Sequence, residues 1–223
     1  MIAMQEQDLR RDIIKTARAM NAQGANQGTS GNISARIEGG FLITPSGIDY
    51  EACALDDIIR MSMDGAPEGP HKPSSEWHLH RDLLAARPEV QAVLHAHPTF
   101  ATALACLRRG IPAFHYMVAV AGGRDIRCAP YATFGTEELS RAVLDAMTER
   151  TACLLANHGM VAVAGSLTGV LTLAIEVETL ARQYYHAMQI GEPVILDDAE
   201  MDVVLGKLPT YICGLDDTDG DME

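Results

Sequence analysis

The chain has 223 residues, 48% of them apolar and 21% charged, which is typical of one globular domain. Its 17 Lys and Arg against 30 Asp and Glu give a net charge of −13, so a nucleic acid is not expected as a partner. Five widely spaced cysteines without a Cys-x-x-Cys pair favour a reducing cytoplasm over a disulfide framework. No apolar run approaches the ~20 residues that span a bilayer, so a membrane partner is not expected either.

The acidic charge is concentrated at the C-terminal end of the chain. Residues 192–223 hold ten acidic residues against Lys207 alone, a net charge of −9, which leaves −4 on the preceding 191 residues. Its final residues are typical of a solvated tail. We therefore predict a domain over 1–212 and an acidic, mobile tail over 213–223.

Hydrophobic periodicity and turn residues predict the following elements in chain order. The first half contains a helix over 6–23, a glycine-rich loop over 26–32, a hairpin of strands 33–37 and 40–44, a turn over 45–47 and a strand over 58–63. The second half contains a helix over 75–86, a strand over 89–96, a helix over 101–107, mixed strand and turn over 111–121, a helix over 137–149, strands 153–157 and 160–164, and helices 167–189 and 199–206. The strands lack a regular βαβ alternation, which predicts a single α/β domain, an α-β-α sandwich with a largely antiparallel sheet.

Two histidines stand two residues apart in an apolar segment, Val93-Leu-His-Ala-His-Pro98. On a strand, residues i and i+2 share a face, so the imidazoles of His95 and His97 would converge. This spacing suits the start of a zinc site. The alternative is two polar residues on an exposed face.

A third histidine, His158, follows another apolar strand and precedes Gly159. Three imidazoles with an open fourth position would form a catalytic metal site. The alternative is a turn histidine beside a glycine, because the sequence gives no distance between His158 and the other pair.

The segment Pro73-Ser-Ser-Glu76 precedes a predicted helix. A serine N-cap at its start would leave free backbone N–H groups and hydroxyls at the positive end of the helix, which suits a phosphate. Glu76 beside it is a candidate metal ligand or base. The alternative is a plain helix cap. His78 and His80 are expected on the surface of this helix.

Several motifs together resemble the class II aldolase/adducin family, over essentially the whole chain. The motifs are Gln27-Gly-Thr-Ser-Gly-Asn-Ile-Ser34, Leu42-Ile-Thr-Pro-Ser-Gly47, Pro73-Ser-Ser-Glu76, His95-Ala-His97, Ile111-Pro-Ala-Phe-His-Tyr-Met117, Cys128-Ala-Pro-Tyr-Ala-Thr-Phe-Gly-Thr136 and Asn157-His-Gly159. They are most similar to the bacterial branch of the family that acts on L-fuculose 1-phosphate.

The resemblance implies a zinc ion on His95, His97 and His158, with Glu76 as a fourth ligand when substrate is absent and as a proton carrier. It implies that Tyr116 is a proton donor contributed across a subunit contact, and that Tyr211 acts from a mobile C-terminal segment of a homotetramer. The substrate phosphate would be bound by Gly31, Asn32, Ser46, Gly47, Ser74 and Ser75.

The implied activity is cleavage of a ketose 1-phosphate, L-fuculose 1-phosphate or a related deoxy sugar, to dihydroxyacetone phosphate and an aldehyde such as L-lactaldehyde. Alternatives within the family are an aldolase for 5-methylthioribulose or 5-deoxyribulose 1-phosphate, and a metal-dependent phosphosugar dehydratase or 4-epimerase. A non-enzymatic adducin-like module is disfavoured, because such a module has no need of three convergent imidazoles.

Overall fold

The computed structural model describes residues 2–216, with side chains described for residues 4–208. The helices are α1 (Ile2–Ala22), α2 (Trp77–Ala86), α3 (Thr99–Cys106), α4 (Glu137–Ala146), α5 (Leu167–Ile190) and α6 (Asp198–Asp216), with short 3-10 helices η1 (Leu55–Asp57) and η2 (Tyr116–Ala121). The strands are β1 (Asn32–Ile37), β2 (Gly40–Ile43), β3 (Ile59–Ser62), β4 (Pro67–Glu68), β5 (Ala92–Ala96), β6 (Cys128–Ala129), β7 (Ala152–Leu155) and β8 (Gly159–Ala164).

The eight strands form one sheet in the order β4-β3-β2-β1-β5-β8-β7-β6. Every neighbouring pair is antiparallel except β6 and β7. In β1–β5 pairing Asn32 lies opposite His95, and in β5–β8 pairing His95 lies opposite Val161. The central strand β5 therefore brings segments from three parts of the chain to one end of the sheet.

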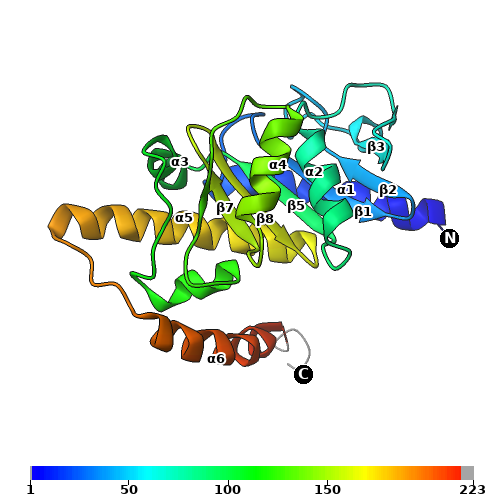
Figure 1. Cartoon of the computed structure of the whole chain (residues 1–223). Helices are drawn as coiled ribbons and strands as arrows, with labels where there is room; N and C mark the ends of the chain where they lie inside the picture. The colour runs from blue at the N-terminus through cyan, green and yellow to red at the C-terminus, as the bar shows by residue number, and fades with distance from the viewer. Residues whose placement is uncertain (1, 217–223) are drawn as a thin grey trace.

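Alternating side chains of the strands bury both faces of the sheet. Val93 and Val161 pack in a cluster with α2 and α4, whereas Leu94 and Met160 pack in a second cluster with α1, α3 and α5. Figure 1 shows α2 and α4 side by side over one face, with α1 and α5 on the other. This confirms the predicted α-β-α sandwich with a largely antiparallel sheet.

Helix α6 lies apart from the sandwich and is reached by an extended segment from the end of α5 (Figure 1). Its Met201 is buried against Ala113 and Ala119, beside η2. The predicted helix over 199–206 is thus part of a longer helix that runs through position 213, the predicted start of the tail. Residues 217–223 lie outside the described part of the chain. No helix within the described residues is long and apolar enough to cross a membrane.

Candidate active site

The histidine pair lies at the end of the central strand. His95 is on β5 and fully buried, and His97 follows β5 and is partly exposed. Their Nε2 atoms are 2.9 Å apart and their ring centroids 4.8 Å apart. The period of two therefore places both imidazoles on one side of the strand.

His158 joins this pair from the turn between β7 and β8. Its ring centroid is 4.8 Å from that of His95 and 4.9 Å from that of His97. The preceding Asn157 has φ +55°, and a Cβ on Gly159 would come within 2.4 Å of the Ala96 carbonyl oxygen and 2.6 Å of the His97 ring. The turn thus needs a glycine after His158 for the two histidines to approach.

The hydrogen bond of His95 Nδ1 with the Met160 carbonyl oxygen is 2.9 Å long. A carbonyl only accepts, so Nδ1 carries a proton and Nε2 is the ring nitrogen that is left to bind a cation. A ligand histidine commonly has such a partner on its other nitrogen. One potential ligand atom from each histidine lies within 4.8 Å of the other two.

Glu76 completes the cluster from the turn before α2. Its side chain is almost fully buried, with Oε2 3.0 Å from Nε2 of His95 and Oε1 3.4 Å from Nε2 of His158. Oε1 has no hydrogen-bond partner among the described residues. Burial alone would raise the pKa of this carboxyl, but His95, His158 and the Asn32 amide outweigh it and lower the pKa to about 2.

Two histidines of the site, His97 and His158, are held in their neutral form. Burial, and then the neighbouring imidazoles, lower the pKa of His97 and of His158 to about 4. Neutral imidazole nitrogens and an ionised carboxylate are the ligands of catalytic zinc sites. Convergent lone pairs, with one carboxylate oxygen unpaired, therefore fit a divalent cation.

Three loops lie side by side next to this cluster. Ile33 N–H donates to Oγ1 of Thr44, Ser74 N–H donates to the Thr44 carbonyl, and Ser46 N–H donates to the Lys72 carbonyl. The structure thereby groups the six residues that were predicted to bind phosphate. Gly31, Asn32 and Ser74 are buried, whereas Ser46, Gly47 and Ser75 are exposed.

The start of α2 differs from the prediction. The helix begins at Trp77 with Glu76 at the cap position and no side-chain cap hydrogen bond, so the predicted serine N-cap and the predicted start at 75 were wrong. The Ser74 hydroxyl instead accepts from the Glu76 backbone N–H at 3.3 Å, in the turn before the helix. This turn directs the Glu76 side chain inward and leaves Ser75 exposed.

The assignment of His80 to the surface was also wrong. Its side chain is fully buried, 2.7 Å from Ser34 Oγ and 2.6 Å from Asn32 Oδ1. His78 is partly buried and stacks on Trp77. Four-residue spacing from Glu76 could have pointed to an inward position for His80, since both then lie on one helix face.

The cluster opens into a pocket of about 280 Å³. Two exposed aromatic rings that the sequence did not single out, Tyr131 and Phe134, form part of its wall beside Ala132. They come from the segment between β6 and α4. The other lining residues are Ser30, Ser75, Glu76, His97, Asn157 and His158.

One of the two tyrosines predicted to act in catalysis lies apart from the pocket of its own chain. Tyr116 begins η2, is 48% exposed and stacks on His115, and it is not among the described residues that line the pocket. Tyr211 is within α6, at a position whose side chain lies outside the described part.

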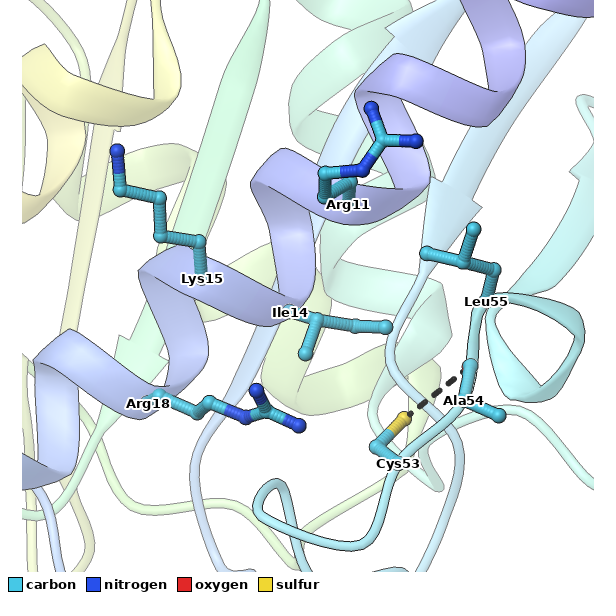
Figure 2. A pocket seen from close by; sticks show the side chains of 7 residues that line it. All are labelled: Arg11, Ile14, Lys15, Arg18, Cys53, Ala54 and Leu55. Carbon is cyan, nitrogen blue, oxygen red and sulfur yellow. Dashed lines mark hydrogen bonds between the residues drawn. The ribbon is translucent and has the colours of Figure 1, made fainter.

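A larger pocket, of about 480 Å³, lies between α1 and the segment before η1 (Figure 2). It is lined by basic side chains, among them Lys15 and Arg18, of which Arg18 is bonded to the Tyr50 carbonyl. None of the clustered histidines or Glu76 lines it. We therefore assign the reaction to the smaller pocket, which is lined by Glu76, His97 and His158.

The chain is similar to known proteins over most of its length. Residues 11–185 match the model of the class II aldolase and adducin N-terminal domain. The chain is 54% identical over 203 residues to the 5-methylthioribulose-1-phosphate/5-deoxyribulose-1-phosphate aldolase of Rhodospirillum rubrum, covering 91% of this chain and 92% of the relative. It is 47% identical over 209 residues to the L-fuculose phosphate aldolase of Escherichia coli K12, covering 93% and 97%.

A solved structure of an L-fuculose 1-phosphate aldolase superposes with a TM-score of 0.88 at 42% identity, covering 91% of this chain and 96% of the other. The chain belongs to the class II aldolase and adducin family, and is an enzyme of its aldolase group. The predicted family is thereby confirmed.

Proposed function

We propose that this chain is a zinc-dependent aldolase that cleaves a ketose 1-phosphate reversibly to dihydroxyacetone phosphate and an aldehyde. The observation that carries the proposal is the meeting of three imidazoles with the ionised, buried carboxylate of Glu76. His95, His97 and His158 would hold the metal, with Glu76 as a fourth ligand before substrate binds. When bound, the cation contributes Lewis-acid stabilisation of the negative charge that cleavage leaves on the C2–C3 fragment.

Glu76 has the properties of the base that moves the proton at C3. Its low pKa keeps the carboxylate ionised at neutral pH, and Asn32 Nδ2 donates to its Oε2 at 3.1 Å. The second oxygen, without a hydrogen-bond partner among the described residues, is free to accept a proton. In synthesis Glu76 would take the proton from C3 of dihydroxyacetone phosphate, and in cleavage it would give a proton to C3 to release that product.

The grouped loops would bind the phosphate of the same substrate. Exposed Ser75 lines the pocket beside Glu76, and the loops of Ser46 and Gly31 are joined to its segment through Thr44. Hydroxyls and backbone N–H groups bind a phosphate without a lysine. A phosphate held there would fix C1 to C3 against the metal site.

The rest of the substrate would lie towards Tyr131 and Phe134, whose apolar rings suit a deoxy sugar ending in a methyl or methylthio group. The oxygen at C4 must lose its proton on cleavage. We assign this proton transfer to Tyr116 of a neighbouring subunit in a homotetramer, with Tyr211 closing the site from the C-terminal segment. The exposure of Tyr116, away from the pocket of its own chain, supports that arrangement.

Two substrate groups are candidates for the aldehyde end. L-Fuculose 1-phosphate would release L-lactaldehyde, and 5-deoxyribulose or 5-methylthioribulose 1-phosphate would release a shorter aldehyde without a hydroxyl group. The 54% identity to the Rhodospirillum rubrum aldolase, against 47% to the Escherichia coli fuculose-type relative, favours the second group.

An activity panel tests the proposal. Zinc-loaded protein is given each ketose 1-phosphate, and release of dihydroxyacetone phosphate is followed by a coupled reductase, with Glu76→Gln as the inactive control. We expect release of dihydroxyacetone phosphate from at least one sugar phosphate, with the highest kcat/KM for a 5-deoxypentulose 1-phosphate. A dehydratase would give no dihydroxyacetone phosphate, and a 4-epimerase would return a full-length isomer, and either result contradicts the proposal.

A further inference from the structure

The buried His80 is a titratable group that the mechanism above does not use. It lies on α2, with both ring nitrogens in hydrogen-bond contact: Nδ1 is 2.7 Å from Ser34 Oγ and Nε2 is 2.6 Å from Asn32 Oδ1. Asn32 in turn donates through Nδ2 to Oε2 of Glu76 at 3.1 Å. One buried series of hydrogen bonds thus joins Ser34, His80, Asn32 and Glu76, and each of these residues is at most 4% exposed.

The chemistry of the four groups determines which group donates in each of these hydrogen bonds. The carboxylate of Glu76 only accepts, so the amide nitrogen of Asn32 must face it and the amide oxygen must face His80. Because that oxygen only accepts, Nε2 of His80 must carry the proton. Nδ1 is then bare and accepts the hydroxyl proton of Ser34, and each bond donates towards Glu76.

This direction requires a neutral imidazole in one tautomer. Burial, and then nearby His95, lower the pKa of His80 to about 3, so the ring stays neutral at physiological pH. A protonated ring would donate from both nitrogens, and the other tautomer would present a lone pair to the Asn32 oxygen. The protonated ring would lose the hydrogen bond that Ser34 donates to Nδ1. The other tautomer would leave the Asn32 amide without its present orientation, since an amide can reverse its ends at almost no steric cost.

We propose that His80 is a positioning residue for the reaction, which orients the Asn32 amide so that it donates to Glu76, while Ser34 donates to the bare nitrogen of the required tautomer. The inference rests on the proposed role of Glu76 as base and metal ligand. A reversed amide would turn its oxygen towards the carboxylate and repel it. His80 therefore acts on the proton carrier without touching substrate or metal.

The tautomer is measured directly in the zinc-loaded protein at neutral pH. Nitrogen-15 NMR of histidine-labelled protein distinguishes a protonated Nε2 from a protonated Nδ1, and the His80 signals are assigned by their loss in His80→Gln. We expect Nε2 protonated and Nδ1 bare. The other tautomer, or a doubly protonated ring, would overturn the inference.

Variants then test the effect on the reaction. His80→Leu removes the donor, and loss of such a supporting group typically costs about 10–100-fold, so kcat should fall by that factor with KM changed by less than about threefold. His80→Gln keeps an N–H for Asn32 and should recover most of the lost kcat. The matched control is His78→Leu. His78 lies on the same helix but makes no hydrogen bond to Ser34, Asn32 or Glu76, so this variant should retain wild-type kcat. Equal damage from the Leu and Gln substitutions, or wild-type kcat in His80→Leu, refutes the positioning role.

Two further measurements keep the inference testable under other outcomes. If His80→Leu does not fold, Ser34→Ala replaces it: we expect a mixed tautomer and a reduced kcat, and wild-type kcat contradicts the proposal. If the wild type cleaves no ketose phosphate, the proposed function fails by itself. Zinc affinity, measured by competition with a chromophoric chelator, still reports on Glu76. It should fall about tenfold or more in His80→Leu and much less in His80→Gln, and an unchanged affinity would refute the orientation of Glu76 by His80.

Discussion

His95 shows why the site suits a cation. With Nδ1 donating to the Met160 carbonyl, its Nε2 lies within 3.0 Å of both the His97 Nε2 and the Glu76 carboxylate. His95→Ala should reduce zinc, measured by elemental analysis, from about one ion per chain to a small fraction. The control is His71→Ala, whose ring pairs with Asp57 outside the site. Undiminished zinc in His95→Ala would contradict the assignment.

The turn after β7 offers a finer test of the same centre. A Cβ at position 159 would come within 2.6 Å of the His97 ring and 2.4 Å of the Ala96 carbonyl, whereas a Cβ at 165 meets nothing within 4 Å. Gly159→Ala should therefore displace His97 and weaken zinc binding, and Gly165→Ala should not. Chelator competition on both proteins measures the difference. Equal affinities would show that the turn tolerates the added methyl group.

The buried His80 also predicts how stability depends on pH in zinc-free protein. Its pKa is about 3 in the folded state and near 6.5 in the unfolded chain, so below pH 6.5 the unfolded state binds more protons. Stability should therefore fall as pH falls, by at most about 2 kcal/mol between pH 6.5 and 5 from this residue. His97 and His158 act with the same sign. Urea unfolding at several pH values should show a shallower slope for His80→Gln than for wild type, and an equal slope would contradict this.

At the scale of elements, the segment before α4 contacts the loop of Ser74 and Ser75 that is proposed to bind phosphate. Gly135 has φ +73°, and a Cβ there would lie 2.8 Å from the Ser75 carbonyl, while the next residue, Thr136, caps α4 by accepting the Leu139 N–H. Gly135→Ala should shift Ser75 and raise KM for the phosphosugar by about tenfold, with zinc retained.

Thr136→Ala is the matched control for that substitution. Loss of the cap should cost about 1 kcal/mol of folding stability and leave KM nearly unchanged. Steady-state kinetics and urea unfolding on both variants separate the two effects. A normal KM in Gly135→Ala would show that this contact does not position the phosphate loop.

The sequence predicted elements well where a local period determines them. The hairpin of β1 and β2 follows from Glu38-Gly39 between apolar runs, and α5 from its apolar spacing. The sequence did not predict the elements whose structure depends on contacts between residues that are distant in the chain. The turn at 74–76 is set by a bond from Ser74 N–H to Thr44, and η2 packs against α5 and α6. Strand β6 is only two residues long and forms by pairing with β7.

The residues of the site were likewise predictable where a local pattern places them, and not where distant contacts do. The convergence of His95 and His97 was predictable from strand alternation, but the approach of His158 depends on the pairing of β8 with β5. Family resemblance supplied that link and the set of phosphate residues. His80 and the pocket rings of Tyr131 and Phe134 were missed, because burial of a helix face and the path of a loop are properties of the folded chain.

At the scale of the whole molecule, a single chain presents only part of the proposed site. The metal-binding cluster and phosphate loops surround one pocket, whereas Tyr116 is 48% exposed on η2, which packs beside α6. A residue that acts on the substrate from such a position would have to enter the pocket of another copy. Cyclic oligomers repeat one such contact around their axis, so every pocket would gain one tyrosine.

Mixed oligomers test this arrangement. Glu76→Gln and Tyr116→Phe should each lose most activity, since an acid–base group is typically worth about 10²–10⁴-fold. When the two variants are co-expressed with different tags and the hybrid is purified through both, some pockets combine an intact Glu76 with an intact Tyr116 from the neighbour. Random equal mixing in a closed ring makes about a quarter of the pockets complete, so activity should return to about that fraction of wild type.

The control is a mixture of the two purified homo-oligomers without subunit exchange, which should stay inactive. If Tyr116 served the pocket of its own chain, no hybrid pocket would be complete, and activity at the level of the parents would exclude the shared site.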